Sequence, residues 1–506
     1  MGGGFIRSLD FAGHVHLLSE TLLDVTDNLC LKPSPLGTVP YTQLTAINLQ
    51  GCSALTTRSL HHLLIRSRSL QNLSLKGLGA VTNTTCDVLA VYCPQLMTLD
   101  MSRCSNMDAD GIRCLATAAI ARGEHLLLKE LRLSGLKHAN DAMMHTLGKA
   151  APYLEVLDLS YVRQLHNSAL EAFVSCEMDE EHLGVETIWL TAREAGRDTN
   201  DSNNYRRRVT RLRHLSVSSC VLLTDIACSN LAHSVPQLEF LEMASIGAEL
   251  KDDGLIKLLN TTPFIRRLDL EDASDISDSV IAAITPASVP DSPARLTMHL
   301  TSEAEPEPGH ALEQLVISYA SNVTDDALLA LIRSCTRLTV LEVDNTRMGA
   351  DVLKEFVQLS SKRQMVDSKI VAIDCRGIGE SVVKDLSGST RPRKGWRAYD
   401  ARKLKYLDGR DDDLKVGQDE CDEKRVVLKT FYSWQTVDAV RSAREKRRKS
   451  TLRRAANDSN GSMTDSDDFS GRATRWWSPG TRRPTGSGAG LPPTMPEMNN
   501  DGCRIM

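Results

Sequence analysis

The sequence predicts an α/β solenoid: a curved, horseshoe-shaped array of repeats with parallel strands on the concave face and helices on the convex face. Three observations predict it. A block of the form Leu-x-x-Leu/Ile-x-Leu/Met/Val recurs along the chain, five of its spacings equal 26 residues, and a helix-like stretch separates successive blocks. The blocks begin at Leu44, Leu70, Leu96, Leu128, Leu154, Leu212, Leu238, Ile265, Leu312 and Leu338.

Each block reads as a strand with one buried face. In residues 70–75, Leu73 and Leu75 alternate with polar neighbours, which is the period-two pattern of a half-buried strand. In residues 85–93 apolar side chains recur at helical spacing, and Pro94 ends that helix. Because one such unit cannot cover its own apolar face, neighbouring units must stack to form a continuous core.

The array is expected to cover residues 1–387. Residues 5–12 read as its first strand and residues 17–31 as the helix that follows. Residues 388–455 are predicted to be a small C-terminal capping segment that ends in a basic helix, because residues 396–404 and 426–434 are unusually rich in aromatics. Residues 456–506 are rich in Ser, Gly, Pro and Asp and are expected to be a disordered tail.

Two insertions interrupt the period. The first, at about residues 193–208, follows an apparent strand at residues 185–190 and holds a polar stretch before three consecutive arginines. The second, at about residues 286–308, is rich in Pro, Ser and Glu. Such compositions cannot bury much apolar area, so both are interpreted as surface loops or short disordered insertions.

A cysteine follows several blocks at a fixed distance. Cys52, Cys104 and Cys220 each come five residues after the first buried strand residue. These frames resemble the cysteine-containing leucine-rich repeats of F-box proteins, the substrate receptors of SCF ubiquitin ligases, over about residues 5–387. The resemblance implies non-enzymatic recognition of a protein substrate for ubiquitin-dependent degradation. It also implies binding to the SCF adaptor and cullin, through a segment not evident in this sequence.

The F-box itself has only a faint counterpart. Residues 18–23 resemble the opening of such a module but lack the proline and the three-helix length that would follow. The alternative function is therefore a stand-alone leucine-rich-repeat scaffold or inhibitor with no ubiquitin role.

Composition narrows the class of protein. The chain is 41% hydrophobic and 25% charged with a net charge of −5, which favours a soluble cytoplasmic protein and gives no reason to expect nucleic-acid binding. No run of 18 apolar residues and no secretory signal is visible. The cysteines are interpreted as small buried hydrophobes, because no paired C-x-x-C motif occurs. No catalytic motif emerges, so neither an enzyme nor a cofactor or metal is expected.

The partner-binding surface is predicted from the strand positions that alternate with the buried ones. The later strands place carboxylates and two aromatics there, which favours a basic protein ligand with an apolar anchor. The alternative is that these carboxylates merely solvate an exposed sheet. The candidate residues are Trp189, Phe240, Glu242, Asp269, Glu271, Glu342, Asp344 and Asp374.

The C-terminal tail carries a separate prediction. Its last four residues, Cys503 to Met506, fit the C-a-a-X pattern, and the final Met favours a farnesyl group on Cys503. One lipid holds a protein only marginally, so an upstream basic cluster would be the second membrane signal. The same cluster also resembles a nuclear-import signal, which leaves membrane association and the nucleus as alternatives. The cluster consists of Lys446, Arg447, Arg448, Lys449, Arg453 and Arg454.

Overall fold

The computed structural model describes residues 5–30, 40–176, 186–195, 197, 201–287, 307–391, 406–408, 422–430 and 434–436. The chain divides into two compact units, 1–442 and 443–506, and every described residue belongs to the first. Within the described residues no helix is both long and apolar enough to cross a bilayer.

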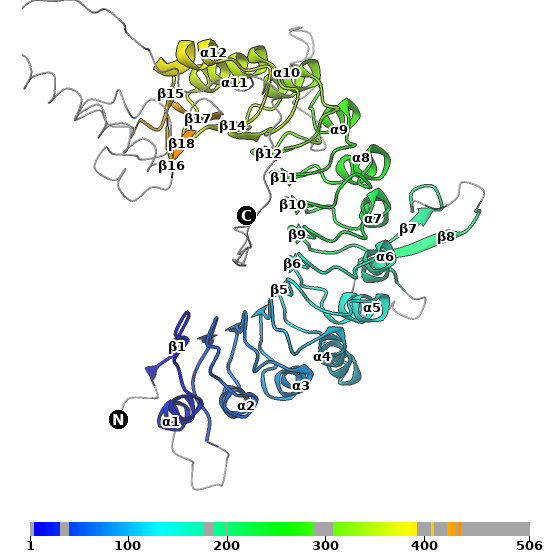
Figure 1. Ribbon diagram of the computed structural model, residues 1–506. Coiled ribbons are helices and arrows are strands. Elements are labelled where there is room, and N and C mark those ends of the chain that lie inside the picture. Colours follow the sequence, from blue (N-terminus) through cyan, green and yellow to red (C-terminus); the bar gives the residue numbers. More distant parts are fainter. Residues whose placement is uncertain are drawn as a thin grey trace, which may run out of the picture. The chain divides into compact units, whose positions relative to one another are not determined.

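One parallel sheet of 14 strands runs through the first unit, in the order β1-β2-β3-β4-β5-β6-β9-β10-β11-β12-β13-β14-β17-β15. In Figure 1 the strands line the inner side of this array and the helices its outer side. The strands are β1 (Ser8–Asp10), β2 (Ala46–Asn48), β3 (Asn72–Ser74), β4 (Thr98–Asp100), β5 (Glu130–Arg132), β6 (Val156–Asp158), β9 (His214–Ser216), β10 (Phe240–Glu242), β11 (Arg267–Asp269), β12 (Gln314–Val316), β13 (Val340–Glu342), β14 (Lys369–Ala372), β17 (Val426–Thr430) and β15 (Thr390–Arg391).

The strands are held in register by one column of buried aliphatic residues. The middle residue of each short strand pairs with the middle residue of the next, as Leu241 does with Leu268. Every member of the column from Ile47 to Leu428 is at most 2% exposed. The column therefore forms the continuous core that the repeat pattern predicts.

A helix follows most strands and covers the same core from outside. Helix α2 shows why these segments are helical: Thr56 caps its N-terminus by accepting from the Ser59 amide, and Leu60, Leu63 and Leu64 recur on its buried face. The helices are α1 (Ser19–Leu29), α2 (Thr57–Arg66), α3 (Asn83–Tyr92), α4 (Ala109–Ala121), α5 (Asp141–Ala150), α6 (Asn167–Val174), α7 (Asp225–Leu231), α8 (Asp252–Asn260), α9 (Asp278–Ala283), α10 (Asp325–Ser334), α11 (Ala350–Lys362), α12 (Glu380–Asp385) and the 3-10 turn η3 (Leu386–Gly388).

The turn after each strand contains a residue in the left-handed region, always at the same position of the repeat. Some repeats place glycine there, but most place a larger residue, so the backbone conformation is imposed by the stacked repeats rather than chosen by the side chain. The row consists of Gly13, Gly51, Gly77, Arg103, Gly135, Tyr161, Ser219, Ser245, Asp272, Tyr319, Asn345 and Asp374, with φ between 51° and 77°.

The repeat cysteines are buried, as predicted. Cys52, Cys104 and Cys220 are at most 6% exposed. The Sγ of Cys104 donates to the Leu75 carbonyl at 3.2 Å, and that of Cys220 donates to the Leu159 carbonyl at 3.2 Å. Burial raises the pKa of Cys104 to about 11 and that of Cys220 to about 12, so these thiols remain protonated donors at neutral pH.

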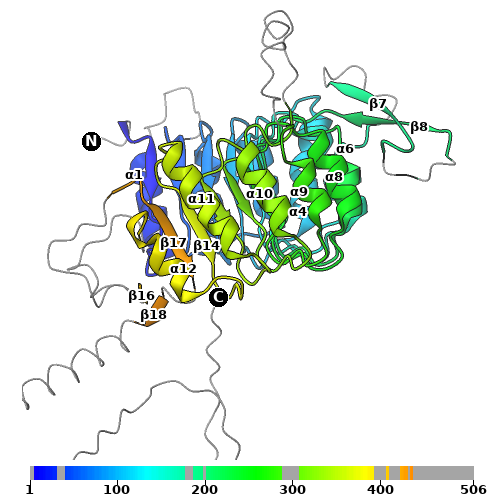
Figure 2. The same cartoon turned by 90° about the horizontal axis from the view of Figure 1, so that it is seen from above.

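The last residues of the first insertion form a strand, which pairs with the strand before the insertion to make a hairpin. Strands β7 (Thr187–Thr191) and β8 (Asn204–Arg208) pair antiparallel and form a sheet of their own, while β6 pairs directly with β9. In Figure 2 the hairpin projects beyond the row of repeats. The interpretation of residues 204–208 as part of a loop or disordered insertion was therefore wrong.

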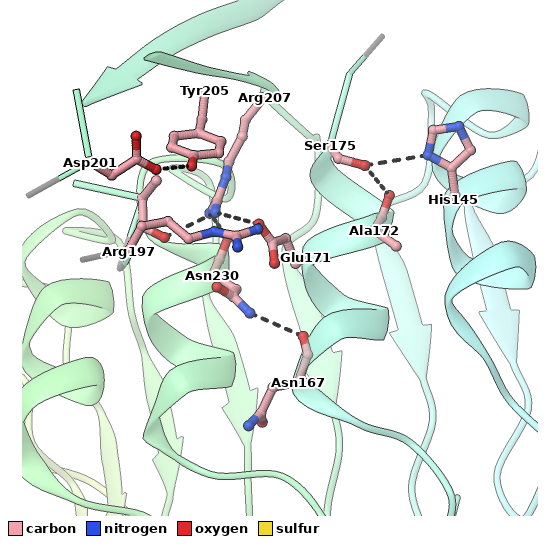
Figure 3. A network of polar contacts seen from close by, with 11 residues as sticks. His145, Asn167, Glu171, Ala172, Ser175, Arg197, Asp201, Tyr205, Arg207 and Asn230 are labelled. Atoms are coloured by element: carbon pink, nitrogen blue, oxygen red, sulfur yellow. Dashed lines mark hydrogen bonds and ion pairs between the residues drawn. The ribbon is translucent and has the colours of Figure 1, made fainter. Parts of the chain in front are cut away.

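A fully buried arginine anchors this hairpin (Figure 3). Arg207 is 1% exposed, donates to the carbonyls of Asn230 and Ala195, and lies 3.4 Å from the Glu171 carboxylate. Arg208 donates to the Phe173 carbonyl at 3.1 Å. Because a buried guanidinium is stable only when its donors are satisfied, these contacts fix the hairpin between α6 and α7.

The C-terminal end of the sheet is formed by chain from beyond the repeats. Strand β17 lies between β14 and β15 and pairs in parallel with both, and Val426 and Leu428 enter the core beside Ile370. A separate antiparallel pair is formed by β16 (Tyr406–Asp408) and β18 (Trp434–Thr436). The residues of the second insertion between 288 and 306, and all residues after 436, lie outside the described part of the chain.

Candidate functional site on the concave face

Strand geometry places most of the predicted acidic residues on the concave face. In β10, Phe240 and Glu242 flank the buried Leu241, and in β11 Asp269 follows the buried Leu268. Because side chains alternate along a strand, the flanking residues face away from the helices. We call Glu242, Asp269, Glu271, Glu342 and Asp344 the acidic strip.

Two rows of carboxylates face each other across β12. The register aligns Asp269 with Val316 and Val316 with Glu342. The hydrogen-bond ladder continues past the strand ends, where Tyr319 donates to the Asp344 carbonyl at 2.8 Å, so Glu271 and Asp344 flank the same strand. Neighbouring strands are about 4.8 Å apart, which puts the two rows roughly 10 Å apart.

The floor between the rows is small and neutral. Val316 and Ser318, which form it, are both buried beneath the level of the carboxylates, and the Ser318 hydroxyl accepts from the Asp344 amide at 3.2 Å. A floor of this kind leaves room for an extended lysine or arginine stem over Val316, with its cation between carboxylates.

Part of the strip is already neutralised by cations from neighbouring strands. Arg267 lies 3.5 Å from Glu242 and 3.3 Å from Asp269. Lys369 on β14 donates to Glu342 at 2.7 Å. These pairs lower the net charge at both ends of the strip and leave its centre acidic.

Glu271 and Asp344 form that centre. Among the described residues, neither carboxylate has a cation within ion-pair distance; the Asp344 carboxylate instead accepts from the Ile373 amide at 2.7 Å. Burial raises the pKa of Glu271, and the charges of Asp269, Asp344 and Glu342 raise it further. Burial likewise raises the pKa of Asp344. An added cation would lower the pKa of both carboxyl groups and stabilise their ionised forms.

The pKa of Glu242 is shifted in the opposite direction. His214 and Arg267 lie beside its carboxylate, and together they lower its pKa to about 2 despite partial burial. Glu242 therefore stays ionised over the whole physiological range. Its role is to fix the ring of His214 and the head of Arg267 at the edge of the strip.

An aromatic side chain borders the strip at β10. The Phe240 ring is tilted against the His214 ring at a centroid distance of 5.6 Å, and the Arg266 guanidinium lies 5.7 Å from its centroid. Phe240 is only half-buried, so it offers an apolar contact beside the carboxylates.

Two residues predicted for this face are not on it. Trp189 lies on the hairpin strand β7, outside the solenoid sheet, where it is 54% exposed and contacts Arg206 at 5.9 Å. Asp374 occupies the left-handed turn position after β14, because the register pairs Glu342 with Val371 and thus Asn345 with Asp374. Cys503 and the basic cluster lie outside the described residues.

Lys369 was missed because the sequence register at β14 was displaced by one residue. The leading leucine of the block is replaced by Asp367, so the block has no leucine to mark its start, and the alternation was read one residue out of register, with Asp374 on the concave face. The position of Cys375 indicates the correct register. In the other frames the cysteine comes five residues after the first buried strand residue, which identifies Ile370 as buried and Lys369 as facing the concave side.

The concave face presents carboxylates, some of them beside cations of the same sheet. The described residues include no group of three or more His, Cys, Asp or Glu side chains placed to hold a metal ion. Within the strip, Glu242, Asp269 and Glu342 have a cation within ion-pair distance.

No family model matches the chain. Among solved structures the chain is similar to one in the crystal structure of the Rad7 and Elc1 complex in yeast, with a TM-score of 0.41, 18% sequence identity, and coverage of 65% of this chain and 76% of that one. By its repeating blocks, its parallel sheet and its outer layer of helices, the described chain is a leucine-rich-repeat solenoid.

Proposed function

We propose that the chain is a non-enzymatic substrate receptor that holds a basic segment of a target protein on its concave face. The observation that supports this function is the pair of carboxylate rows across β12, with Glu271 and Asp344 left without a cationic partner among the described residues. A bound lysine or arginine would complete the charge pattern that Arg267 and Lys369 begin.

The proposed context is an SCF-type ubiquitin ligase. Support comes from the cysteine-containing repeat frames, which resemble the substrate-recognition part of F-box proteins. In that role the solenoid would select the target, and the adaptor and cullin would bring it to the ubiquitin-transfer machinery.

Binding by the acidic strip can be tested with a fluorescein-labelled peptide in which lysine and arginine flank a central leucine. The double exchange Glu271→Lys and Glu342→Lys should weaken binding of this peptide by at least ~10-fold, because it puts lysines that repel the peptide's cations on both sides of Val316. The matched control is Asp24→Lys with Asp87→Lys, which makes the same change of charge on exposed positions of α1 and α3. Equal affinity of the strip variant and the wild type would rule out the concave site.

The ubiquitin context needs a separate experiment. Affinity purification of the full-length chain from its own cells, followed by mass spectrometry, should recover the SCF adaptor and cullin together with target proteins. Recovery of a stable partner without adaptor or cullin would instead establish the scaffold or inhibitor alternative.

A further inference from the structure

A second surface, of opposite charge to the acidic strip, lies in the turns that connect strands β5 and β6 to the helices that follow them. A hollow of about 400 Å³ opens there, lined by Gly135, Lys137, His138, Tyr161, Arg163 and Gln164 among others. We call it the Tyr161 hollow. It belongs to the edge of the array, whereas the acidic strip belongs to the concave face of later repeats.

A glycine lies between two longer side chains at this edge of the array. Arg103, Gly135 and Tyr161 occupy the same left-handed turn position in three consecutive repeats. Because Gly135 has no side chain, the Arg103 guanidinium reaches past it to lie 5.9 Å from the centroid of the Tyr161 ring. A Cβ at position 135 would meet the Cγ of Arg103 at 4.0 Å. The tyrosine is 52% exposed, so one face of the hollow is an accessible aromatic ring.

Two cations, Lys137 and Arg163, line the hollow, and a third, Arg103, contacts its tyrosine. None of the three has a described carboxylate as ion-pair partner. Arg103 contacts Tyr161, Lys137 donates to the Ser105 carbonyl at 2.7 Å, and Arg163 is exposed. Their positive charges are therefore available to a ligand.

The acidic residues of the adjoining helices are occupied by other groups. Asp110 pairs with Arg113 at 3.1 Å, and Asp141 accepts from the Ser168 hydroxyl at 2.9 Å. Asp108 caps α4. The N-termini of α5 and α6 lie at the same edge and add positive potential to it.

An apolar patch continues the hollow into the next repeat. The register of β5, β6 and β9 places Lys137, Arg163 and Val221 at equivalent positions of consecutive repeats. Val221 is 56% exposed and the adjacent Leu222 is 42% exposed. Exposed aliphatic side chains beside unpaired cations are typical of a surface that another chain covers.

We infer that the Tyr161 hollow binds an acidic peptide segment of a partner protein, with a bulky apolar side chain of that segment seated on Val221 and Leu222. Charge complementarity identifies the occupant: the carboxylates of the segment pair with Lys137, Arg163 and Arg103, and its backbone passes over Tyr161. A basic segment suited to the acidic strip is repelled here. The solenoid therefore has two docking surfaces of opposite sign and can hold two different protein segments at once.

The probe is a fluorescein-labelled peptide in which aspartate and glutamate flank a central leucine, titrated against the full-length chain. The double variant Lys137→Glu, Arg163→Glu should weaken binding of this peptide by at least ~10-fold. The double variant Val221→Ser, Leu222→Ser should weaken it severalfold. The matched control for charge is Arg58→Glu with Lys257→Glu, on exposed positions of α2 and α8. Equal losses in the control and hollow variants would show non-specific attraction and overturn the proposal.

Site mapping supplies a readout that does not depend on any variant. A photoreactive diazirine analogue of leucine in the same peptide should crosslink to residues 135–164 and 221–226. Crosslinking confined to other repeats would overturn the proposal. So would a loss of vesicle binding in the Lys137→Glu, Arg163→Glu variant without a loss of peptide binding, measured on phosphatidylserine vesicles, because the hollow would then recognise a lipid surface.

Discussion

At the scale of single residues, the recurrent cysteine explains how neighbouring repeats are joined. Four of these thiols donate to the carbonyl just after the strand of the preceding repeat: Cys52 to Phe11, Cys104 to Leu75, Cys220 to Leu159 and Cys375 to Val343. Other repeats place an aliphatic residue at this position, as Leu78 and Val162 do. Cysteine is small, apolar and a weak donor, so it fills the core and also gives a second donor to a carbonyl that already accepts from the turn.

Cys220→Ala is expected to lower the free energy of unfolding by about 1–2 kcal/mol, because it leaves the Leu159 carbonyl without the thiol donor and creates a small cavity. Chemical denaturation followed by circular dichroism measures the change. Cys114→Ala is the control, since Cys114 is exposed, and it should be neutral. If both variants unfold at the same denaturant concentration as the wild type, the thiol has no structural role.

Two carboxylates of the acidic strip are expected to affect stability in opposite directions. Glu271 has a raised pKa in the folded protein, so its ionised form is disfavoured there; Glu271→Gln should raise the melting temperature at pH 7, and the gain should vanish as the pH falls through the raised pKa. Glu242 has its pKa lowered from 4.5 to about 2. Its contribution is present above pH 4.5 and is lost as the pH falls towards 2, so Glu242→Gln should cost stability on the order of 2 kcal/mol at pH 7.

Thermal melts of both variants across pH 2–8 test this pair. Melting temperatures that move in the same direction at pH 7 would contradict the electrostatic account of the strip.

At the scale of elements, the periodic parts of the chain could be predicted from the sequence, and the strand at the end of the first insertion could not. Strands such as β3 and helices such as α3 follow from apolar spacing alone. Strand β7 resembles a repeat strand, because Ile188 and Leu190 alternate with Thr187, Trp189 and Thr191. For this reason the sequence placed Trp189 on the concave face. The sequence between residues 191 and 212 lacks the helical spacing of apolar residues that a repeat needs after its strand, and this feature distinguishes β7 from a repeat strand.

The carboxylates of the candidate site could be predicted from the sequence, and their contacts with cations on neighbouring strands could not. Glu242, Asp269, Glu271, Glu342 and Asp344 follow from alternation within well-formed blocks. The pairs of Glu242 with Arg267 and of Glu342 with Lys369 join neighbouring strands. Such lateral contacts depend on register between repeats, which local pattern does not specify.

The hairpin formed by β7 and β8 should depend on Arg207. Arg207→Ala leaves the Glu171 carboxylate with Arg197 alone and removes the donors to the Ala195 and Asn230 carbonyls, so residues 187–208 should exchange their amide hydrogens much faster. Hydrogen exchange with mass spectrometry measures this. Arg206→Ala, which removes the cross-strand contacts to the Trp189 ring and the Thr187 hydroxyl, is the control and should lower the protection of the hairpin less than Arg207→Ala does. Unchanged protection in Arg207→Ala would show that strand pairing alone holds the hairpin.

At the scale of the first unit, each repeat contacts chiefly its neighbours, so damage should remain local. The sheet is a single row of strands from β1 to β15, and each helix packs on the helices before and after it. Stability in such an array is the sum of repeat and interface contributions rather than of one central core.

Leu428→Ser tests this locality at the C-terminal end. The polar side chain would lie in the core beside Ile370, and protection from hydrogen exchange should fall in β13, β14 and α11 while β2 to β5 keep theirs. Exposed Lys424→Ser is the control. A uniform loss of protection over all repeats would show that the array unfolds as one cooperative unit.

Pairing across the two insertions is as regular as pairing elsewhere. Leu157 meets Leu215 and Leu268 meets Leu315 in the same column, although the connections between these strands are much longer than one repeat. The distance between neighbouring strands is thus independent of the length of chain that joins them. Foreign domains, such as a fluorescent reporter or an affinity module, could be grafted into residues 288–306 while the carboxylate rows on either side of β12 keep their spacing.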